Sequence, residues 1–425
     1  MRVRELTISN FRAFSEPPPF RFSERFTVIA GVNGRGKTAV LDGLAILFSR
    51  LLPLISPARG GHRLMTRSDI HIGTESAILS MKVNCAGIPL DYRLTLARED
   101  RRIVATELTD AVRREVQTIY GDPHRADDAG PLVVYYTTDR AGYSLPRILP
   151  TEVPRGQAVA YTGALRNRTV NFRDFMSRFR STIILENEQR RENPAFLGDR
   201  VVVAISEALH NFLGEFRNLR VETDPLRLLI DKGDVPLDLS QLSDGERSFL
   251  ALVCDLCRRL ALANPLLPNP LHGAGVVLID ELELHLHPTW QREVAQKLRT
   301  TFPNIQFVAT THSPFVIQSI RPGELINLDP EEFAEYADKS IEDIAEQVMG
   351  VEVPQKSERF LQMMQTAEEY FQLLRHFPAE PEDAIRAAEQ RLNELAARYS
   401  DDPAFQALLK IERTTLLGGE NNAPR

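Results

Sequence analysis

The sequence predicts an α/β protein with a parallel sheet at its centre. A strand, a glycine-rich loop and a helix follow one another within residues 26–48. Between residues 241 and 320, predicted helices alternate with two apolar strands at 275–280 and 305–310. This alternation is typical of a parallel sheet that helices cover. Antiparallel strands elsewhere make the sheet content mixed, and the residues after about 330 are predicted to be helical.

The first 140 residues should be rich in strands. Apolar and polar residues alternate from Val3 to Ile8, and the run from Phe26 to Ile29 is apolar throughout. Both patterns predict strands. Further strands are predicted at 75–96, as a β-meander, and at 131–136, whereas 97–130 are expected to be charged loops.

Residues 155–215 are predicted to form a helical insert with a basic surface. Between Arg155 and Arg191 there are eight arginines and three acidic residues. Within this run, Arg166, Arg168 and Arg173 are the candidate contacts for nucleic acid or for an acidic partner. The alternative is an ordinary solvated face, the commoner origin of an exposed charge run.

A helical domain is predicted for residues 331–413. Ser340 and Asp343 have the spacing of a capping box, and Phe360, Met364 and Phe371 then recur at helical spacing. This stripe either completes the protein's own core or docks a partner, and partner docking is the prediction made here. Residues 1–330 are then the main domain, and 414–425 are expected to be a disordered tail.

Composition fits a packed protein. Of the 425 residues, 43% are hydrophobic and 26% charged, and the net charge of −7 does not favour indiscriminate nucleic-acid binding. No apolar run reaches the ~18–20 residues of a membrane span. Cys85, Cys254 and Cys257 cannot form a disulfide framework, and the last two are expected to be core residues of one helix. We therefore expect a cytoplasmic protein without membrane contact.

The first chemical motif is a phosphate-binding loop. Residues 31–38, Gly-Val-Asn-Gly-Arg-Gly-Lys-Thr, match GxxxxGK[ST] between a strand and a helix. Asn33, Gly34 and Gly36 belong to the part of the loop whose backbone N–H groups face a phosphate. Lys37 is expected to reach the β- and γ-phosphates of a nucleotide, and the Thr38 hydroxyl to coordinate Mg²⁺.

The second motif is an apolar strand, 275–279, that ends in Asp280 and Glu281. The carboxyl ends of parallel strands are where such sheets bind ligands. Asp280 is expected to hold Mg²⁺ through water, and Glu281 to orient or deprotonate an attacking water. Two exposed acidic residues after a strand are common in isolation. Beside a phosphate-binding loop they become stronger evidence for a nucleotide site.

Two further motifs complete the set. Leu-Ser-Asp-Gly-Glu-Arg at 242–247 opens a long helix, and Ser243 and Glu246 have capping-box spacing. An open helix N-terminus with a serine hydroxyl also suits an anion. The strand at 305–310 is followed by His312, which is expected at the same sheet edge as Asp280 and within reach of a γ-phosphate.

In this order the four motifs resemble those of the ABC-type ATPases, from Walker A to the His switch. The resemblance implies an ABC-type P-loop fold, ATP and Mg²⁺ as ligands, and catalytic roles for Glu281 and His312. It also implies a dimer that sandwiches two ATP molecules, in which one chain's Ser243, Gly245 and Glu246 close on the γ-phosphate held by the other. Acidic residues within the signature are similar to those of the SMC/RecF-like branch. Ser68-Asp69-Ile70 is a candidate Gln-loop region.

A narrower resemblance lies in residues 283–290, 302–317 and 133–140. These stretches are similar to stand-alone ATPases of anti-phage defence, closest to the Septu ATPase subunits called PtuA. That resemblance implies an HNH endonuclease partner, PtuB-like, and related versions occur with retrons and hence with reverse transcriptase and its RNA–DNA. His285 and His287 would then lie at the dimer seam, although with Glu283 they could instead bind a metal.

Related ATPases carry a C-terminal Toprim nuclease, which needs a DxD-like acidic pair. Residues 321–425 contain no DxD, so the chain is not expected to cut nucleic acid itself. The alternatives are a RecF/SMC-like DNA-binding ATPase of repair and, less favoured, a transporter ATPase subunit. The 205 positions from Thr38 to Ser243 are too many for the usual transporter insert and lack the heptads of a coiled coil.

Overall fold

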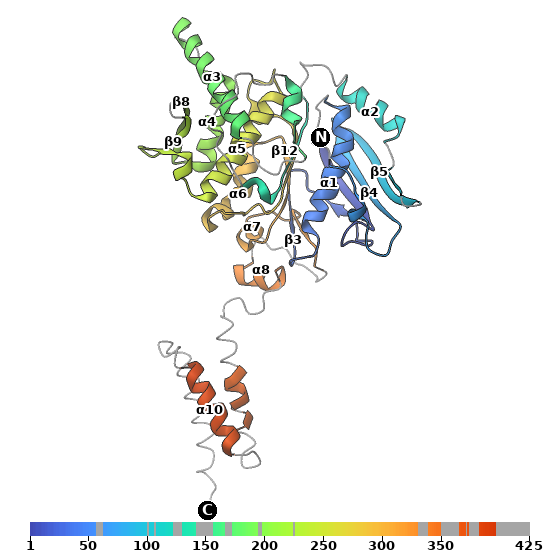
Figure 1. Ribbon diagram of the computed structural model, residues 1–425, viewed down its shortest axis with the longest axis vertical. Helices are drawn as coiled ribbons and strands as arrows, with labels where there is room; N and C mark the ends of the chain where they lie inside the picture. The colour runs from blue at the N-terminus through green and yellow to red at the C-terminus, as the bar shows by residue number, and fades with distance from the viewer. Residues whose placement is uncertain are drawn as a thin grey trace, which may run out of the picture. The chain divides into compact units, whose positions relative to one another are not determined.

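The structure is a computed structural model of the whole chain. It describes residues 1–56, 63–99, 102–105, 108–121, 130–141, 156–165, 172–193, 198–223, 226–329, 339–349, 365–370, 372–373 and 382–396. The chain divides into two compact units, Met1–Gly350 and Val351–Arg425, each of which is described by itself (Figure 1). The division falls at Gly350, whereas the sequence placed the boundary near 330.

A parallel sheet forms the centre of the first unit. Its strand order is β13-β3-β12-β11-β7, and every neighbouring pair is parallel. The strands are β3 (Phe26–Ala30), β7 (Leu132–Tyr136), β11 (Gly275–Ile279), β12 (Ile305–Thr310) and β13 (Leu325–Asn327). Because the strands run in one direction, the carboxyl ends of β3, β11 and β12 meet at one edge of the sheet.

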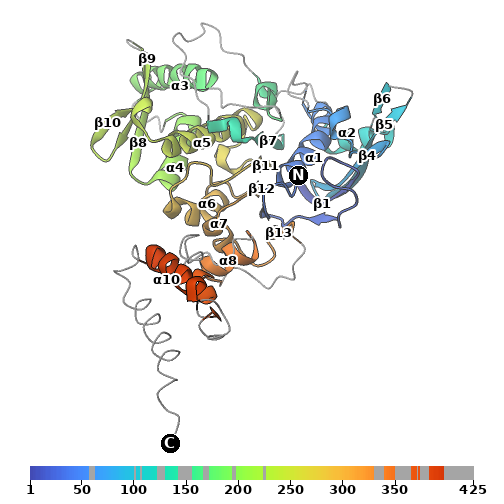
Figure 2. The same ribbon diagram turned by 60° about the horizontal axis from the view of Figure 1, so that its bottom comes forward.

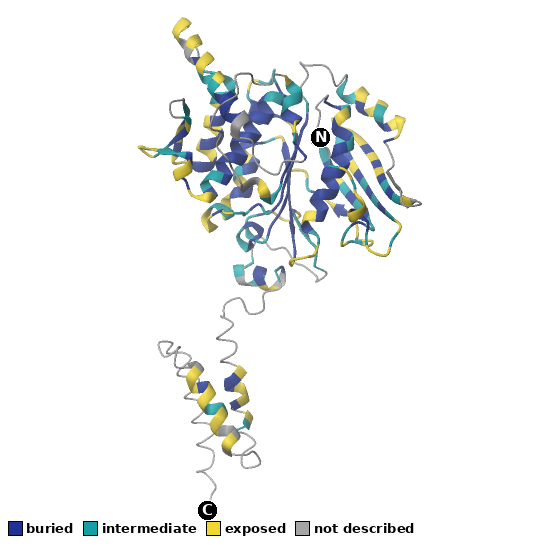
Figure 3. Cartoon of the chain, viewed as in Figure 1, coloured by how far each residue is buried: buried dark blue, intermediate teal, exposed yellow. Residues whose placement is uncertain are grey.

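Two cores lie on opposite faces of this sheet because alternate side chains of a strand point to opposite sides. Val277 and Ile279 of β11 belong to the core shared with α4 (Arg200–Leu213), α5 (Asp244–Ala263) and α6 (Pro288–Thr301). Val276 and Leu278 belong to the core shared with α1 (Lys37–Leu51) and an antiparallel sheet. Figure 3 shows the central strands buried between these two layers.

The antiparallel sheet has the order β2-β1-β4-β5-β6. Its strands are β1 (Arg2–Ser9), β2 (Phe20–Arg21), β4 (Ser76–Cys85), β5 (Ile88–Glu99) and β6 (Arg102–Ala105). The predicted meander is confirmed as β4 and β5. The prediction of loops at 97–130 was wrong, because β6 and α2 (Asp110–Tyr120) lie there. Only Val112 and Val116 of α2 are buried, so its charged residues concealed the helical pattern.

Helices cover the other face of the central sheet (Figure 2). The insert contains α3 (Phe172–Glu192) and α4, as predicted. An antiparallel sheet of order β10-β9-β8 follows α4, with strands β8 (Phe216–Thr223), β9 (Leu226–Lys232) and β10 (Val235–Asp238). The elements are joined by 3₁₀-helices η1 (Leu52–Leu54), η2 (Arg67–Asp69), η3 (Thr138–Ala141), η4 (Gln157–Tyr161), η5 (Leu239–Gln241) and η6 (Pro270–His272).

The end of the first unit is held by α7 (Pro314–Gln318) and α8 (Ile341–Gln347). Ile344 and Val348 share a small core with Ala30 and Ile317, so the predicted capping box at Ser340 opens a helix of the first unit. In the second unit, residues 365–370 and α10 (Glu382–Ala396) are helical. Phe360, Met364, Phe371 and the predicted tail 414–425 lie outside the described residues. No helix in the described part of the chain is long and apolar enough to span a membrane.

A buried ion cluster joins α5 to the central sheet. Asp255 is fully buried and accepts from Arg258 (2.6 Å), Arg259 (2.7 Å) and the Tyr136 hydroxyl of β7 (3.0 Å). Burial raises the pKa of Asp255, but attraction to Arg259 and Arg258 outweighs it and holds that pKa well below its usual value. Arg259 also donates to Ala160 O (2.6 Å), which ties η4 to the same cluster.

We expect Asp255→Ala to lower the free energy of unfolding by about 3–5 kcal/mol, because two buried guanidinium groups lose their shared carboxylate. Glu222→Ala, which removes an exposed partner of Arg227, should change it by about 1 kcal/mol or less. Urea denaturation of both variants measures the contrast. Equal midpoints would show that the cluster contributes no more than a surface pair.

Candidate nucleotide-binding site

The loop of residues 31–36 connects β3 to α1 and leaves the N-terminus of α1 open. Gly34 and Gly36 have φ values of 83° and 96°, which glycine adopts readily. A Cβ on Gly36 would lie 2.7 Å from the ring of Phe14, so side chains are also excluded by packing. Gly36 is the N-cap of α1 and provides no side-chain cap. The first backbone N–H groups of α1 therefore have no side-chain cap from Gly36, which suits the anion binding that stays a prediction for this loop.

Lys37 is the first residue of α1, and its ammonium group lies inside the loop. Its Nζ donates to Gly31 O (2.7 Å) and Val32 O (3.1 Å), and the residue is only 6% exposed. Burial lowers the pKa of Lys37, although nearby carboxylates, first Asp329 and then Glu283, act in the opposite direction. Two carbonyl groups of the loop thus hold the ammonium group of Lys37 inside the loop.

The structure brings Thr38 and Asp280 together, although 242 positions separate them. The Thr38 hydroxyl lies 3.1–3.2 Å from both carboxylate oxygens of Asp280. The Thr310 hydroxyl, at the end of β12, donates to Asp280 Oδ1 at 2.6 Å. Hydroxyl and carboxylate oxygens are the ligands that Mg²⁺ prefers. The donor set therefore fits Mg²⁺, with Thr38 and Asp280 as the residues that would hold it.

Thr310 also positions Glu281. The backbone N–H of Glu281 donates to Thr310 Oγ1 at 2.7 Å, and Glu281 has φ 49°, a conformation that non-glycine residues seldom adopt. Such strain persists where the surroundings impose it, often at functional sites. Thr310 was not among the site residues predicted from the sequence. The only sequence feature that pointed to it was its position at the end of the strand before His312.

The backbone of His312 is anchored by Glu283. Its N–H donates to Glu283 Oε1, and the Thr311 hydroxyl donates to Oε2 at 2.6 Å. The His312 ring makes no hydrogen bond with any described residue. His312 therefore lies at the predicted edge of the sheet, two residues beyond Thr310, and its contact with a γ-phosphate stays a prediction.

Ser243 and Glu246 form the predicted capping box at the start of α5. Ser243 N donates to Glu246 Oε2 (2.9 Å), and Ser243 Oγ accepts from Glu246 N (3.3 Å). Lys232 of β9 donates to Glu246 Oε1 at 2.8 Å. No hydrogen bond or ion pair in the described ranges joins this helix start to residues 31–38.

Gly245 lies against the loop that follows β11. A Cβ at this position would come well inside 3.0 Å of the carbonyl oxygen of His285. His285 itself has φ 63°. The glycine of the signature is thus required within its own chain, for a backbone contact that the sequence analysis did not predict.

His287 caps α6, because its Nδ1 accepts from the backbone N–H of Thr289 at 3.4 Å. The Glu283 carboxylate accepts hydrogen bonds from the Thr311 hydroxyl and from the backbone N–H of His312. Among the described residues no group of three or more histidine, cysteine, aspartate or glutamate side chains is placed to hold a metal ion. The position of His285 and His287 at a dimer seam stays a prediction.

Asp329, two residues after β13, contacts the phosphate loop from outside. Its Oδ2 accepts from Val32 N at 2.7 Å, and its Oδ1 lies 2.7 Å from Arg35 Nε. Among the carboxylates that raise the pKa of Lys37, Asp329 has the largest effect. Sequence reasoning missed Asp329 because only the pairing of β13 with β3 brings it to the loop.

The candidate Gln-loop region at 68–70 contains the end of η2, and its role as a Gln loop stays a prediction. Asp69 completes the capping box of η2 with Thr66 and accepts from Arg12 Nε at 2.8 Å. The carboxyl end of β7 is adjacent to the site, since Asp280 N donates to Tyr136 O at 2.8 Å. Arg166 and Arg168 lie outside the described residues, as does the side chain of Arg173, so their predicted contact with nucleic acid is untested.

A family model described as "AAA domain, putative AbiEii toxin, Type IV TA system" matches residues 26–318, which include every motif of this site. The chain belongs to this AAA-domain family. The match begins at the first residue of β3 and ends at the last residue of α7, so it contains every strand of the central parallel sheet except β13.

Relatives of this AAA-domain protein include a retron probable ATPase and a Septu protein. It is 30% identical over 389 residues to the "Retron Ec83 probable ATPase" of Escherichia coli, covering 75% of this chain and 70% of the relative. It is 23% identical to the Septu protein PtuA of Bacillus thuringiensis, covering 82% and 84%. The expected resemblance to stand-alone defence ATPases is confirmed. Among solved structures, an SMC head bound to a ScpA domain is similar over 73% of this chain, with 16% identity and a TM-score of 0.44.

We expect Gly245→Ala to destabilise the nucleotide-free protein by about 1–3 kcal/mol, because the added methyl group displaces the His285 carbonyl. Gly43→Ala in α1 is the matched control, since its Cβ would meet Leu79 at 3.5 Å and Leu6 at 3.8 Å, which are ordinary van der Waals contacts. Thermal denaturation without nucleotide compares the two. Unchanged stability of Gly245→Ala would mean that this glycine is needed only for contacts outside its own chain.

Proposed function

We propose that this protein is a Mg²⁺-dependent ATPase that regulates a separate effector in an anti-phage defence complex of the cytoplasm. The observation that carries the proposal is the convergence of Lys37, Thr38 and Asp280 at one sheet edge, with Thr310 bridging Asp280 and Glu281. A phosphate-binding loop, a cation site and an acidic residue that can orient an attacking water are then adjacent. This is the set that phosphoryl transfer to water requires.

Each residue has a distinct role in the proposed hydrolysis. Lys37 binds the β- and γ-phosphates and leaves the carbonyls of Gly31 and Val32 when it does so. Thr38 and Asp280 hold Mg²⁺, which neutralises charge on the phosphates when bound. Glu281 orients the attacking water and accepts its proton, and its strained backbone keeps the carboxylate beside the site.

The proposed active unit is a head-to-tail dimer. Ser243, Gly245 and Glu246 of one chain would close on the ATP held by the phosphate loop of a partner. Within the described residues no hydrogen bond or ion pair joins this helix start to residues 31–38 of its own chain, which is compatible with the arrangement. The backbone contact of Gly245 with His285 supports this arrangement, because it links the signature helix to the loop that directly follows Asp280 and Glu281. His285 and His287 would then lie near the seam.

The proposed effector is an HNH endonuclease. Relatives of this chain are named for retrons and for Septu, both of which are defence systems. Residues 321–425 contain no DxD acidic pair of the kind that a Toprim nuclease needs. We therefore assign cleavage to a partner, with a reverse transcriptase and its RNA–DNA as further components in a retron setting.

We expect Glu281→Gln to bind ATP with unchanged affinity and to lose ~10²–10⁴-fold in turnover, because one positioned proton acceptor is removed. Lys37→Ala should lose ATP binding. Phosphate release and titration with a fluorescent ATP analogue measure the two quantities. Glu293→Gln on α6, which removes only an exposed partner of Lys297, is the matched control. Normal turnover in Glu281→Gln would remove this residue from the mechanism.

Mixing two inactive variants tests the shared site. Ser243→Arg blocks the signature, and Lys37→Ala blocks the phosphate loop. In a mixed dimer, one composite site carries both changes and the other carries neither, so partial ATPase activity should return. Mixtures that stay as inactive as either variant alone would contradict the head-to-tail dimer.

Truncation tests the docking role proposed for the residues beyond the first unit. We place the cut after Gly350, because a cut near 335 would remove α8 and its contacts with Ala30 and Ile317. The truncated protein should still bind ATP and should no longer co-purify with an HNH endonuclease encoded beside it. Retained co-purification would place the interface in the first unit.

A further inference from the structure

A cavity lies between α3, α4 and α5, outside the nucleotide site. Its volume is about 130 Å³. One water molecule needs only ~10–15 Å³ of such space, so the cavity can hold a polyatomic ligand. The side chains that line it come from all three helices: Phe175, Arg178, Phe179 and Thr182 from α3, Arg200, Val201 and Ile205 from α4, and Arg258, Ala261 and Leu262 from α5.

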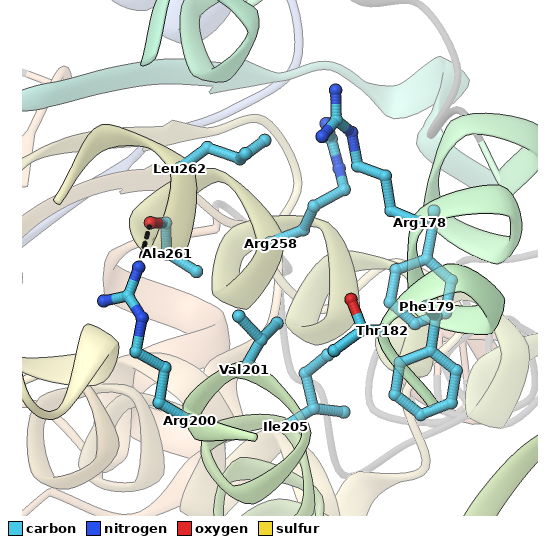
Figure 4. A pocket seen from close by; sticks show the side chains of 10 residues that line it. Arg178, Phe179, Thr182, Arg200, Val201, Ile205, Arg258, Ala261 and Leu262 are labelled. Atoms are coloured by element: carbon cyan, nitrogen blue, oxygen red, sulfur yellow. Dashed lines mark hydrogen bonds between the residues drawn. The ribbon is translucent and has the colours of Figure 1, made fainter. Parts of the chain in front are cut away.

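The lining is cationic. Among the described residues that line the cavity there are three arginines and no acidic side chain. The guanidinium of Arg200 donates to the carbonyls of Leu267 (2.9 Å) and Asn264 (3.1 Å) just beyond α5. The other two arginines are Arg178 and Arg258, and Figure 4 shows their side chains extending in the same direction from α3 and α5.

Arg258 shares its carboxylate partner with a second arginine. Its Nε and Nη2 donate to Asp255 Oδ1, at 3.2 and 2.6 Å, while Asp255 Oδ2 accepts from Arg259. Nη1 of Arg258 makes no hydrogen bond with a described residue. An anion in the cavity could therefore gain a charge-assisted hydrogen bond from Arg258.

The other side chains that line the cavity indicate which group the ligand should carry besides its charge. Phe175, Phe179 and Ile205 are at most 4% exposed and form an apolar side. Thr182 adds a hydroxyl group. Guanidinium groups bind phosphate through parallel N–H donors, which a compact phosphate group in this space could accept. The chemistry therefore favours an anionic phosphate joined to an organic group over a free inorganic ion.

We propose that this cavity, the arginine pocket, binds a phosphate monoester, with the phosphate on Arg178 and Arg258 and the organic substituent toward the apolar side. Such a group occurs on a mononucleotide and on the 5′ end of a nucleic acid. The arginine pocket lies at the C-terminal half of α5, and Ser243 lies at its N-terminus. The 15 residues between Ser243 and Arg258 correspond to about 22 Å of helix, so one rigid element joins the pocket to the signature.

The experiment uses the full chain with Lys37→Ala, which removes binding at the phosphate loop and so separates the two sites. The probes are adenosine 5′-monophosphate, a 5′-phosphorylated oligonucleotide, the same oligonucleotide with a 5′-hydroxyl, and inorganic phosphate. Calorimetric titration measures each affinity. Arg178→Gln should weaken binding of the phosphorylated probes at least tenfold, whereas Arg191→Gln, an exposed arginine of the same helix, should leave it unchanged.

The probes also distinguish the source of the ligand. Binding of adenosine 5′-monophosphate supports a mononucleotide, and binding of the 5′-phosphorylated oligonucleotide alone supports a nucleic-acid end. Thr182→Phe fills the cavity without removing a charge and should abolish binding too, which keeps the test valid if Arg178→Gln does not fold. The proposal is overturned if neither ester binds at millimolar concentration, or if both variants bind like the parent.

Discussion

The hydroxyl group of Thr310 holds the site together. It donates to Asp280 and accepts from the backbone of Glu281, so one side chain of β12 sets the positions of both acids after β11. Asp280 in turn reaches Thr38 on α1. These bonds exist only because β3, β12 and β11 are parallel neighbours in a fixed register. The central sheet is therefore the part of the fold on which the chemistry depends.

Local patterns in the sequence were sufficient for the phosphate loop, the two acids and the capping box of α5, because each is encoded within about eight consecutive residues. Contacts between distant segments were not predictable in the same way. Thr310, Asp329 and the approach of Gly245 to His285 depend on strand order and register, which spacing alone does not reveal. The helix at 110–120 was missed for a different reason. Only two of its side chains face a core, so charge dominated the pattern.

Helix α5 connects more of the molecule than its motif suggests. Its N-terminus carries Ser243 and contacts the loop after β11, its middle binds β7 through Asp255 and Tyr136, and its C-terminal half lines the arginine pocket. The buried ions at Asp255 oppose any shift of α5 relative to the sheet, since displacement would separate charges inside the protein. We therefore expect α5 to move as a rigid body.

Asp329 gives the phosphate loop a second connection. Its carboxylate bonds the loop at Val32 and Arg35, and the chain runs on from it toward α8, the last helix of the first unit. A loop that reshapes around a nucleotide would have to keep or break these bonds. Either outcome would act on the end of β13, so a change in the loop would be transmitted to the edge of the central sheet.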